Sequence, residues 1–221
     1  KVDAAKRDKG MSAGFGKVAR SGDIVAETKG LVVGFANHPL FGPMDWTARI
    51  GERWGIIGEN GVGKSTLLKV LAGDLAPLSG TARLGSNVVP GFFTQDASDL
   101  DPEMSPLETL IWDLNMEPQP ARDLLGRFLI SGDDVYRPIK SLSGGEKNKL
   151  SLAKLTYLNP NLLVLDEPTN HLDMDSREAL ADVLKQYQGT LILVSHDRWL
   201  LSQVGTATLD VRRAGVVSFP G

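Results

Sequence analysis

The fold of this chain is decided by the stretch Gly58-Glu59-Asn60-Gly61-Val62-Gly63-Lys64-Ser65-Thr66. It follows an apolar segment from Trp54 to Ile57 and precedes an apolar-periodic segment that begins at Leu67, so we expect a strand, a glycine turn and a helix. The turn fits the spacing G-x-x-x-x-G-K-S/T, in which backbone N–H groups cradle phosphates, the lysine reaches the β- and γ-oxygens and the hydroxyl binds Mg²⁺. A glycine-rich turn with a chance lysine is the alternative, but the strand-to-helix context favours a nucleotide phosphate site.

The composition is that of an ordinary globular protein. The 221 residues are 42% hydrophobic and 23% charged, which suits one well-buried α/β domain with a smaller subdomain. The sequence has no apolar run long enough for a membrane span, no cysteine and no visible secretory signal, which agrees with a cytoplasmic protein. Because it begins at Lys1, we expect a fragment of a longer protein, although Met11 could also be a start.

Charge is distributed unevenly along the chain. Residues 1–20 carry six basic and two acidic groups, or +4, and the remaining 18 basic and 25 acidic groups sum to −7, which together give the net charge of −3. A basic arm on an acidic body can contact RNA phosphates, but a solvated linker is often charged as well, so both interpretations stay open. Residues 1–30 also lack periodicity, and we expect an inter-domain linker there and a folded domain over 31–221.

The pattern around the glycine turn predicts an α/β fold with further parts. A strand over 31–33 and an antiparallel continuation over 40–50 indicate a β subdomain, and Phe35 is either an aromatic that stacks on an adenine ring or an ordinary core or surface residue. Two amphipathic helices within about 100–142 indicate a small helical subdomain. The first begins with a capping box at 105–108, and the second carries apolar residues at helical spacing, namely Ala121, Leu124, Leu125, Phe128 and Leu129.

A second glycine-rich helix start lies at Leu142-Ser143-Gly144-Gly145-Glu146. Ser143 and Glu146 have the spacing of a capping box, so this segment could simply begin a helix. Capping does not require the two glycines, however, and they leave backbone N–H groups bare at a helix N-terminus. We therefore also expect a second anion site here, able to grip a γ-phosphate.

The apolar strand predicted over 162–165 ends in two carboxylates, Asp166 and Glu167. Its residues are apolar on both faces, as in a central parallel strand, and ligands of open α/β sheets bind beyond the carboxyl ends of such strands. We therefore expect Asp166 to hold Mg²⁺, directly or through water, and Glu167 to polarise the attacking water as general base.

Two other strand ends carry polar groups. His196 follows the strand 190–194 and can donate to a γ-phosphate or sense its loss. Gln95 ends a shorter strand, where its carbonyl can bind Mg²⁺ or orient water, although most exposed glutamines do neither. The helix that follows the two carboxylates is expected to have Asp175 and Glu178 in its N-cap and N3 positions.

Five of these segments, in this order, resemble the ATP-binding cassette (ABC) ATPases: the phosphate loop, Gln95, residues 142–146, Leu165-Asp166-Glu167 and His196. The resemblance covers about residues 31–221 and implies a P-loop NTPase fold, with a RecA-like, mostly parallel sheet core, an antiparallel β subdomain and a small helical subdomain. It also implies ATP and Mg²⁺ as cofactors, and two cassettes that close head to tail. Ser143, Gly144 and Gly145 would then complete the site of a partner cassette.

The resemblance also implies roles for individual residues. Lys64, Glu167 and His196 match the catalytic positions, and Asp173 matches an acidic residue that communicates across the dimer interface. The nucleotide ligands implied in this way are Phe35, Gly58, Glu59, Asn60, Gly61, Val62, Gly63, Lys64, Ser65, Thr66, Gln95, Ser143, Gly144 and Gly145, and the Mg²⁺ ligands are Ser65, Gln95 and Asp166.

Within this superfamily, Glu167-Pro168-Thr169-Asn170-His171-Leu172-Asp173 and Ser195-His196-Asp197-Arg198 resemble the ABC-F subfamily. Those soluble proteins hold two cassettes in one chain without a transmembrane domain, and many act on the ribosome as translation factors or antibiotic-resistance proteins. This chain holds one cassette. The basic linker before it and Phe219-Pro220-Gly221 at its end indicate the second, C-terminal cassette, whose ATP hydrolysis would be weak without its partner.

Two other function classes fit the same residues. The cassette could be the ATPase motor subunit of a membrane ABC transporter, coupled to transmembrane helices of another chain, but Asn170-His171-Leu172-Asp173 favours the ABC-F subfamily. It could also be an interaction module in which ATP serves mainly as glue between cassettes, which the intact Glu167 and His196 argue against. We therefore expect a cytoplasmic ATPase that binds a second cassette and the ribosome.

Overall fold

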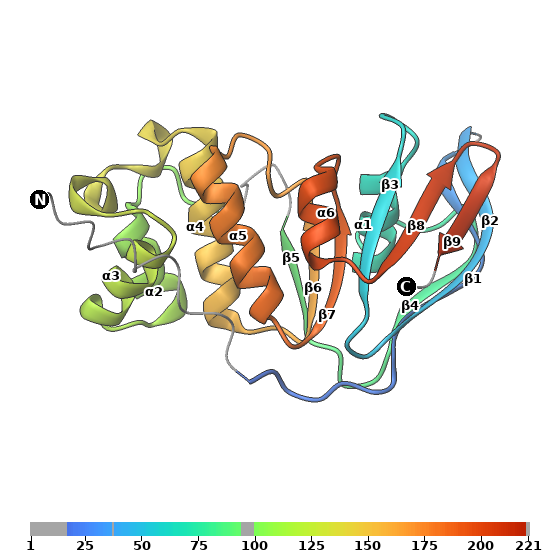
Figure 1. Cartoon of the computed structure of the whole chain (residues 1–221), viewed down its shortest axis with the longest axis horizontal. Helices are drawn as coiled ribbons and strands as arrows, with labels where there is room; N and C mark the ends of the chain where they lie inside the picture. The colour runs from blue at the N-terminus through green and yellow to red at the C-terminus, as the bar shows by residue number, and fades with distance from the viewer. Residues whose placement is uncertain (1–16, 37, 94–99, 220–221) are drawn as a thin grey trace, which may run out of the picture. The chain divides into compact units, whose positions relative to one another are not determined.

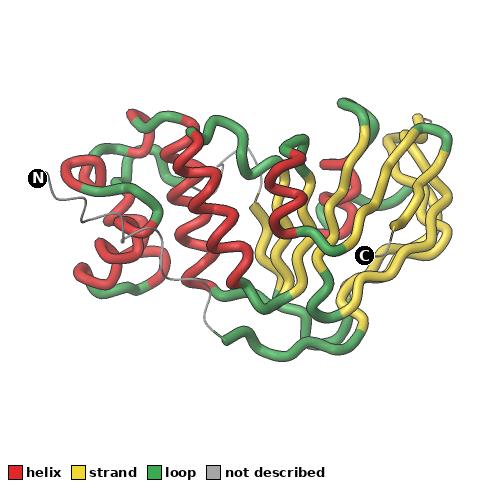
Figure 2. The backbone as a smooth tube through the Cα atoms, viewed as in Figure 1, coloured by secondary structure: helices red, strands yellow, loops and turns green. Residues whose placement is uncertain are grey.

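A computed structural model describes residues 17–36, 38–93 and 100–219 of the chain. These residues form two compact units (Figure 1). We use the name sheet unit for residues 17–93, 159–169 and 188–219, and the name helical unit for residues 100–158 and 170–187. Figure 2 shows that the strands gather in the sheet unit.

The strands of the sheet unit form two sheets. An antiparallel three-stranded sheet has the order β2-β1-β4, and a six-stranded sheet has the order β5-β6-β7-β3-β8-β9, in which only β9 runs antiparallel to its neighbour. This confirms the predicted mostly parallel core and antiparallel β subdomain. The elements are β1 (Ile24–Phe35), β2 (His38–Arg49), β3 (Arg53–Gly58), α1 (Lys64–Ala72), β4 (Ser79–Leu84), β5 (Pro90–Phe93), β6 (Leu162–Asp166), β7 (Thr190–Val194), α6 (Arg198–Val204), β8 (Ala207–Arg212) and β9 (Gly215–Phe219).

The centre of the six-stranded sheet is apolar on both faces. β6 and β7 are buried along their whole length, as a central parallel strand requires. Helix α1 contacts β1 and β4 on one side and β3 and β6 on the other, so it lies between the two sheets. Its residues Leu67, Leu68, Val70 and Leu71 join the strand residues in one hydrophobic core. This core holds β3, β6 and β7 in a fixed parallel register.

The first strand begins inside the stretch expected to be a linker. β1 starts at Ile24, and Val25 and Ala26 are fully buried in a strand that pairs with both β2 and β4. Gly30 has a φ of 53° at a register shift of the β1–β2 pair, so it marks a bulge within a continuous strand. The folded domain therefore starts N-terminal of residue 31.

The helical unit contains the predicted pair of amphipathic helices and two longer ones. The capping box of α2 is confirmed, because Ser105 Oγ accepts from Glu108 N at 3.3 Å and Glu108 Oε2 accepts from Ser105 N at 2.8 Å. α2 packs against α3, and both contact α4. The unit extends beyond the expected range 100–142. Its elements are α2 (Pro106–Leu114), α3 (Pro118–Arg127), the 3-10 helices η1 (Gly132–Tyr136) and η2 (Ile139–Ser141), α4 (Gly144–Leu158) and α5 (Met174–Gln186).

Helix α3 ends earlier than its apolar spacing indicates. It stops at Arg127, and Leu129 has a left-handed φ of 58° and is 46% exposed. Ile130 N donates to Leu125 O at 3.0 Å and thereby closes the helix. The expectation that this helix continues through Leu129 is therefore wrong, and Phe128 is its buried C-cap. Within the described ranges, no helix is long and apolar enough to cross a membrane.

A buried asparagine joins three segments of the sheet unit. Asn161 is 3% exposed, and its Oδ1 accepts from Val89 N at 2.7 Å. Its Nδ2 donates to Asn87 O at 2.9 Å and to Ala19 O at 3.1 Å. The side chain thus fixes the stretch before β1 and the turn before β5 onto the start of β6.

We expect Asn161→Asp to lower the free energy of unfolding by about 2–4 kcal/mol, because it places a buried carboxylate against two carbonyl oxygens. Urea denaturation followed by circular dichroism measures the change. The control is Gln119→Ala, which removes an exposed bond to Asp123 and should cost at most about 0.5 kcal/mol. Wild-type stability in Asn161→Asp would contradict the anchoring role.

Candidate active site

The predicted phosphate loop connects β3 to α1 and holds three glycines with positive φ. The φ angle is 152° at Gly58, 74° at Gly61 and 114° at Gly63. A Cβ atom on Gly58 would lie 2.3 Å from the carbonyl oxygen of Val211, so this position has no room for a side chain. Gly63 is also the N-cap of α1. The loop therefore presents backbone N–H groups at a helix N-terminus, which is the geometry that binds phosphate.

Lys64 is the first residue of α1, and only 7% of its surface is exposed. Its Nζ donates to the carbonyl oxygens of Gly58 and Glu59, each at 3.0 Å, and lies 3.3 Å from His196 Nε2. Burial lowers the pKa of Lys64, and the negative charges of the two carboxylates at the end of β6 oppose this shift. The ammonium group is thus held inside the loop by backbone carbonyls.

Glu167 directly follows β6 and contacts His196. Its φ is 49°, which is uncommon for glutamate, and its N–H donates to Val194 O at 2.9 Å. Oε2 accepts from His196 N at 3.2 Å, and Oε1 lies 3.5 Å from His196 Nε2. Glu167 is 9% exposed, and burial raises its pKa against the opposing effects of His196 and Lys64. A carboxylate with a raised pKa at a strand end can act as a general base.

His196 and the start of the phosphate loop border a hollow of about 940 Å³ at the carboxyl ends of the parallel strands, whereas Lys64 and Glu167 do not line it. Its wall includes Gly58, Glu59 and Asn60 from the loop, and Ser195 and His196 from the end of β7. Residues of α6, β8 and the turn before β9 complete the lining. The hollow therefore adjoins the phosphate loop but does not contain Lys64 or Glu167.

The other predicted residues of the sheet unit lie in different settings. Asp166 is the last residue of β6 and is 9% exposed, whereas Ser65 is exposed in the first turn of α1. Phe35 is 54% exposed at the end of β1. Gln95 lies outside the described residues. The structure therefore brings together Lys64, Glu167 and His196 among the residues that the sequence singled out.

The glycine-rich start of α4 belongs to the helical unit, and its capping box is formed. Glu146 Oε2 accepts from Ser143 N at 2.7 Å, and Ser143 Oγ accepts from Glu146 N at 3.3 Å. A Cβ atom on Gly145 would lie 2.4 Å from the carbonyl oxygen of His171, whereas one on Gly144 would lie 3.5 Å from the His171 ring. Gly145 thus has a packing role that its spacing did not reveal.

The turn before α5 is bound to α4 by side chains that the sequence analysis missed. Asn148 Nδ2 donates to Asn170 O at 2.8 Å, and Lys149 Nζ lies 3.9 Å from Asp173 Oδ2. Asp173 Oδ1 accepts from Ser176 N at 2.8 Å, which makes Asp173 the N-cap and lowers its pKa. The expectation that the caps are Asp175 and Glu178 is wrong, because the helix begins earlier, at Met174. No local sequence pattern distinguishes a helix capped by Asp173 from one capped by Asp175.

A family model described as "ABC transporter" matches residues 41–170. The chain belongs to the ABC transporter family. It is an ATP-binding cassette, the ATPase domain of that family.

Several curated relatives match this cassette along most of its length. They are the ATP-binding protein YbiT of Escherichia coli O157:H7 (44% identity, covering 88% of this chain and 37% of the relative), the ATP-binding protein YdiF of Bacillus subtilis (41%, 97% and 34%) and ABC transporter F family member 2 of Arabidopsis thaliana (39%, 96% and 32%). The chain therefore spans about a third of the length of these relatives.

Solved structures confirm the fold. The ATP-binding cassette MJ0796, in a dimeric post-hydrolysis state bound to ADP and Pi, matches with a TM-score of 0.76 and 20% identity, covering 88% of this chain and 98% of that one. A bacterial Atm1-family ABC exporter with ATP bound matches with a TM-score of 0.80 and 16% identity, covering 92% and 40%. The predicted P-loop ABC ATPase fold is therefore correct.

The two glycines at the start of α4 form a matched pair for mutation. We expect Gly145→Ala to lower the free energy of unfolding of the cassette by about 1–3 kcal/mol, since its Cβ would overlap a backbone oxygen. Gly144→Ala should be neutral or stabilising by up to about 1 kcal/mol, because its Cβ has room and alanine favours helices. Chemical denaturation measures both. Equal effects would contradict the close contact with His171.

We expect Glu167→Gln to be more stable than the wild-type cassette at pH 7–8. Burial raises the pKa of Glu167, so the wild type loses stability as the pH rises through that pKa, whereas glutamine stays neutral. The melting temperature of Glu167→Gln should exceed that of the wild type by about 2–4 °C for each kcal/mol of added stability. The two melting temperatures should converge below about pH 4, where Glu167 is protonated in both the folded and the unfolded wild type.

Glu178→Gln is the control for this comparison, because Glu178 is exposed on α5. It should follow the wild-type melting curve at every pH. A constant difference between Glu167→Gln and wild type across pH would contradict the buried-carboxylate interpretation.

Proposed function

We propose that this cassette is part of a soluble ABC-F protein, in which ATP-driven closure of two cassettes changes how the protein binds the ribosome. The observation that carries the enzymatic part is the cluster of Lys64, Glu167 and His196 beside the phosphate loop. The similarity to ABC transporter F family member 2 of Arabidopsis thaliana supports the subfamily. We place the chain as the second, C-terminal cassette of that protein.

Within this proposal, the sheet unit binds the nucleotide. Phe35 stacks on adenine, residues 58–66 cradle the phosphates, and Lys64 leaves its carbonyl partners to bind the β- and γ-oxygens. Glu167 takes the proton of the attacking water, and the nearby His196 binds the γ-phosphate. Ser143, Gly144 and Gly145 complete the site of the partner cassette, and Asp173 lies at that interface.

The residues present suit Mg²⁺. The described residues hold no cluster of three or more His, Cys, Asp or Glu side chains that could bind a metal alone. Mg²⁺ is usually held by one or two carboxylates together with substrate phosphates, and the buried carboxylate of Asp166 and the exposed hydroxyl of Ser65 are groups of this kind. We assign Ser65, Asp166 and Gln95 as its ligands. When bound, Mg²⁺ neutralises charge on the phosphate oxygens.

A second candidate is the ATPase motor of a membrane transporter. The family description "ABC transporter" favours it. The two candidates share the same nucleotide chemistry and differ in the partner that closure moves. A test must therefore identify the binding partner and also measure ATP turnover.

The enzymatic part is tested by Glu167→Gln. We expect ATP turnover to fall by about 10²–10⁴-fold, the usual contribution of a general base, with ATP affinity unchanged. Steady-state phosphate release and equilibrium binding of a fluorescent ATP analogue measure the two quantities. Glu178→Gln controls for the loss of a charge. Undiminished turnover would show that Glu167 is not the base.

The partner is tested by co-sedimentation of the full-length protein with purified ribosomes, with and without ATP. The protein carries Glu167→Gln and the matching change in its other cassette, so that closed states accumulate. ATP-dependent ribosome binding is the expected result. Recruitment to membrane vesicles without ribosome binding would favour the transporter motor instead.

A further inference from the structure

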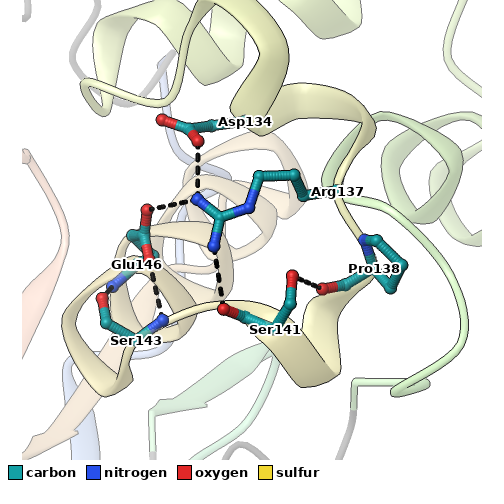
Figure 3. A network of polar contacts seen from close by, with 6 residues as sticks. All are labelled: Asp134, Arg137, Pro138, Ser141, Ser143 and Glu146. Atoms are coloured by element: carbon teal, nitrogen blue, oxygen red, sulfur yellow. Dashed lines mark hydrogen bonds and ion pairs between the residues drawn. The ribbon is translucent and has the colours of Figure 1, made fainter.

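Arg137, between η1 and η2, makes polar contacts with residues on three sides (Figure 3). Its Nη1 donates to Asp134 Oδ1 at 2.8 Å and lies 3.7 Å from Glu146 Oε1. Its Nη2 donates to the carbonyl oxygen of Ser141 at 2.9 Å. One planar guanidinium thus joins residues of three successive elements, η1, η2 and α4.

Two of these contacts bracket the turn that leads into α4. Ser141 is also held by Pro138, because its Oγ donates to Pro138 O at 2.7 Å. On the other side of the turn, Glu146 uses Oε2 to accept from Ser143 N and directs Oε1 toward Arg137. The turn over 141–146 is therefore fixed at both ends by the same side chain.

The position of Ser143 suits an anion. Its Oγ accepts from Glu146 N, which leaves the hydroxyl hydrogen able to donate outward. Ser143 and Gly144 are exposed at the N-terminus of α4, where backbone N–H groups attract negative charge. A small displacement of this turn would change the direction of every donor in it.

Charge adds a second effect. The carboxylate of Glu146 lies in the first turn of α4, beside the same donors, and it would repel an incoming phosphate. Arg137 lies against Glu146 and Asp134 and offsets part of their negative charge, and its hydrogen bond to Asp134 raises its pKa, so it stays protonated. The Arg137 side chain is 43% exposed, and exposed ion pairs add little to folding stability. The network therefore acts on the shape and charge of the turn.

We propose that Arg137 is a positioning residue that holds residues 141–146 and screens Glu146, so that this turn can receive the γ-phosphate bound by a partner cassette. This inference rests on the proposed function, because it assumes that the turn acts on the site of a second cassette. Arg137 itself does not touch the nucleotide.

The first test compares Arg137→Ala, Arg137→Lys and the control Arg122→Ala in the full-length protein. Arg122 is an exposed arginine of the same unit, and its contact is with Tyr136. We expect Arg137→Ala to lower kcat/KM for ATP about tenfold, the size of coupling between contacting charged groups. Arg137→Lys should recover part of the loss, since lysine keeps the charge without the fork. Arg122→Ala should match wild type.

The readouts separate positioning from misfolding. Equilibrium binding of a fluorescent ATP analogue and the melting temperature should be unchanged in Arg137→Ala, because the phosphate loop is intact. If the wild-type protein hydrolyses ATP and Arg137→Ala has the same kcat/KM, the inference is overturned. Parallel losses of binding, melting temperature and turnover would also overturn it, as they indicate a general structural role. A wild-type protein that does not hydrolyse ATP would instead overturn the proposed function.

The second test is a double-mutant cycle with Glu146→Gln. Glutamine keeps an oxygen that can accept from Ser143 N but removes the negative charge. If Arg137 screens Glu146, the loss caused by Arg137→Ala should shrink from about tenfold to about threefold or less in the Glu146→Gln background. An equal loss in both backgrounds would overturn the screening part of the proposal.

Discussion

The parallel register of β3, β6 and β7 is the constraint on which the candidate active site depends. Ile56 of β3 and Asp166 of β6 both lie opposite Val194 of β7, so β6 and β7 end together and β3 continues to Gly58. A slip of one residue would turn fully buried apolar side chains to the opposite face, which the core on both sides forbids. Hydrophobic packing of the strands therefore sets the distances from Lys64 to Glu167 and His196, although these polar side chains are not part of the core.

The helical unit places the turn over 141–146 by a different principle. No sheet register is available there, so the start of α4 is located by close backbone packing of Gly145 on His171 and by the polar network around Arg137. The contact of Gly145 with His171 leaves no room for a side chain, and the network requires the planar guanidinium group of Arg137. Steric fit thus fixes where the turn lies, and hydrogen bonds fix its shape.

Features that follow from residue spacing could be predicted, whereas strand bulges and the exact ends of helices could not. The phosphate loop and the capping box at Ser105 follow from spacing alone. Gly30 was interpreted as part of a linker because a bulge is visible only when the partner strand is known. Leu129 continues an apolar helical pattern but ends in a left-handed turn. Asp173, like Asp175, precedes an apolar helix, and only the hydrogen bond to Ser176 decides which residue caps it.

The carbonyl contacts of Lys64 bear on how readily nucleotide leaves the cassette. A buried ammonium without partners would be costly, and a nucleotide that relieved this cost would be held very tightly. Because the carbonyl oxygens of Gly58 and Glu59 already accept from the ammonium group, the phosphate contact that we propose for Lys64 would exchange one set of acceptors for another. The lysine can return to the carbonyls when products depart. The nucleotide would then be bound less tightly and released more readily, which suits an ATPase that must release its products in every cycle.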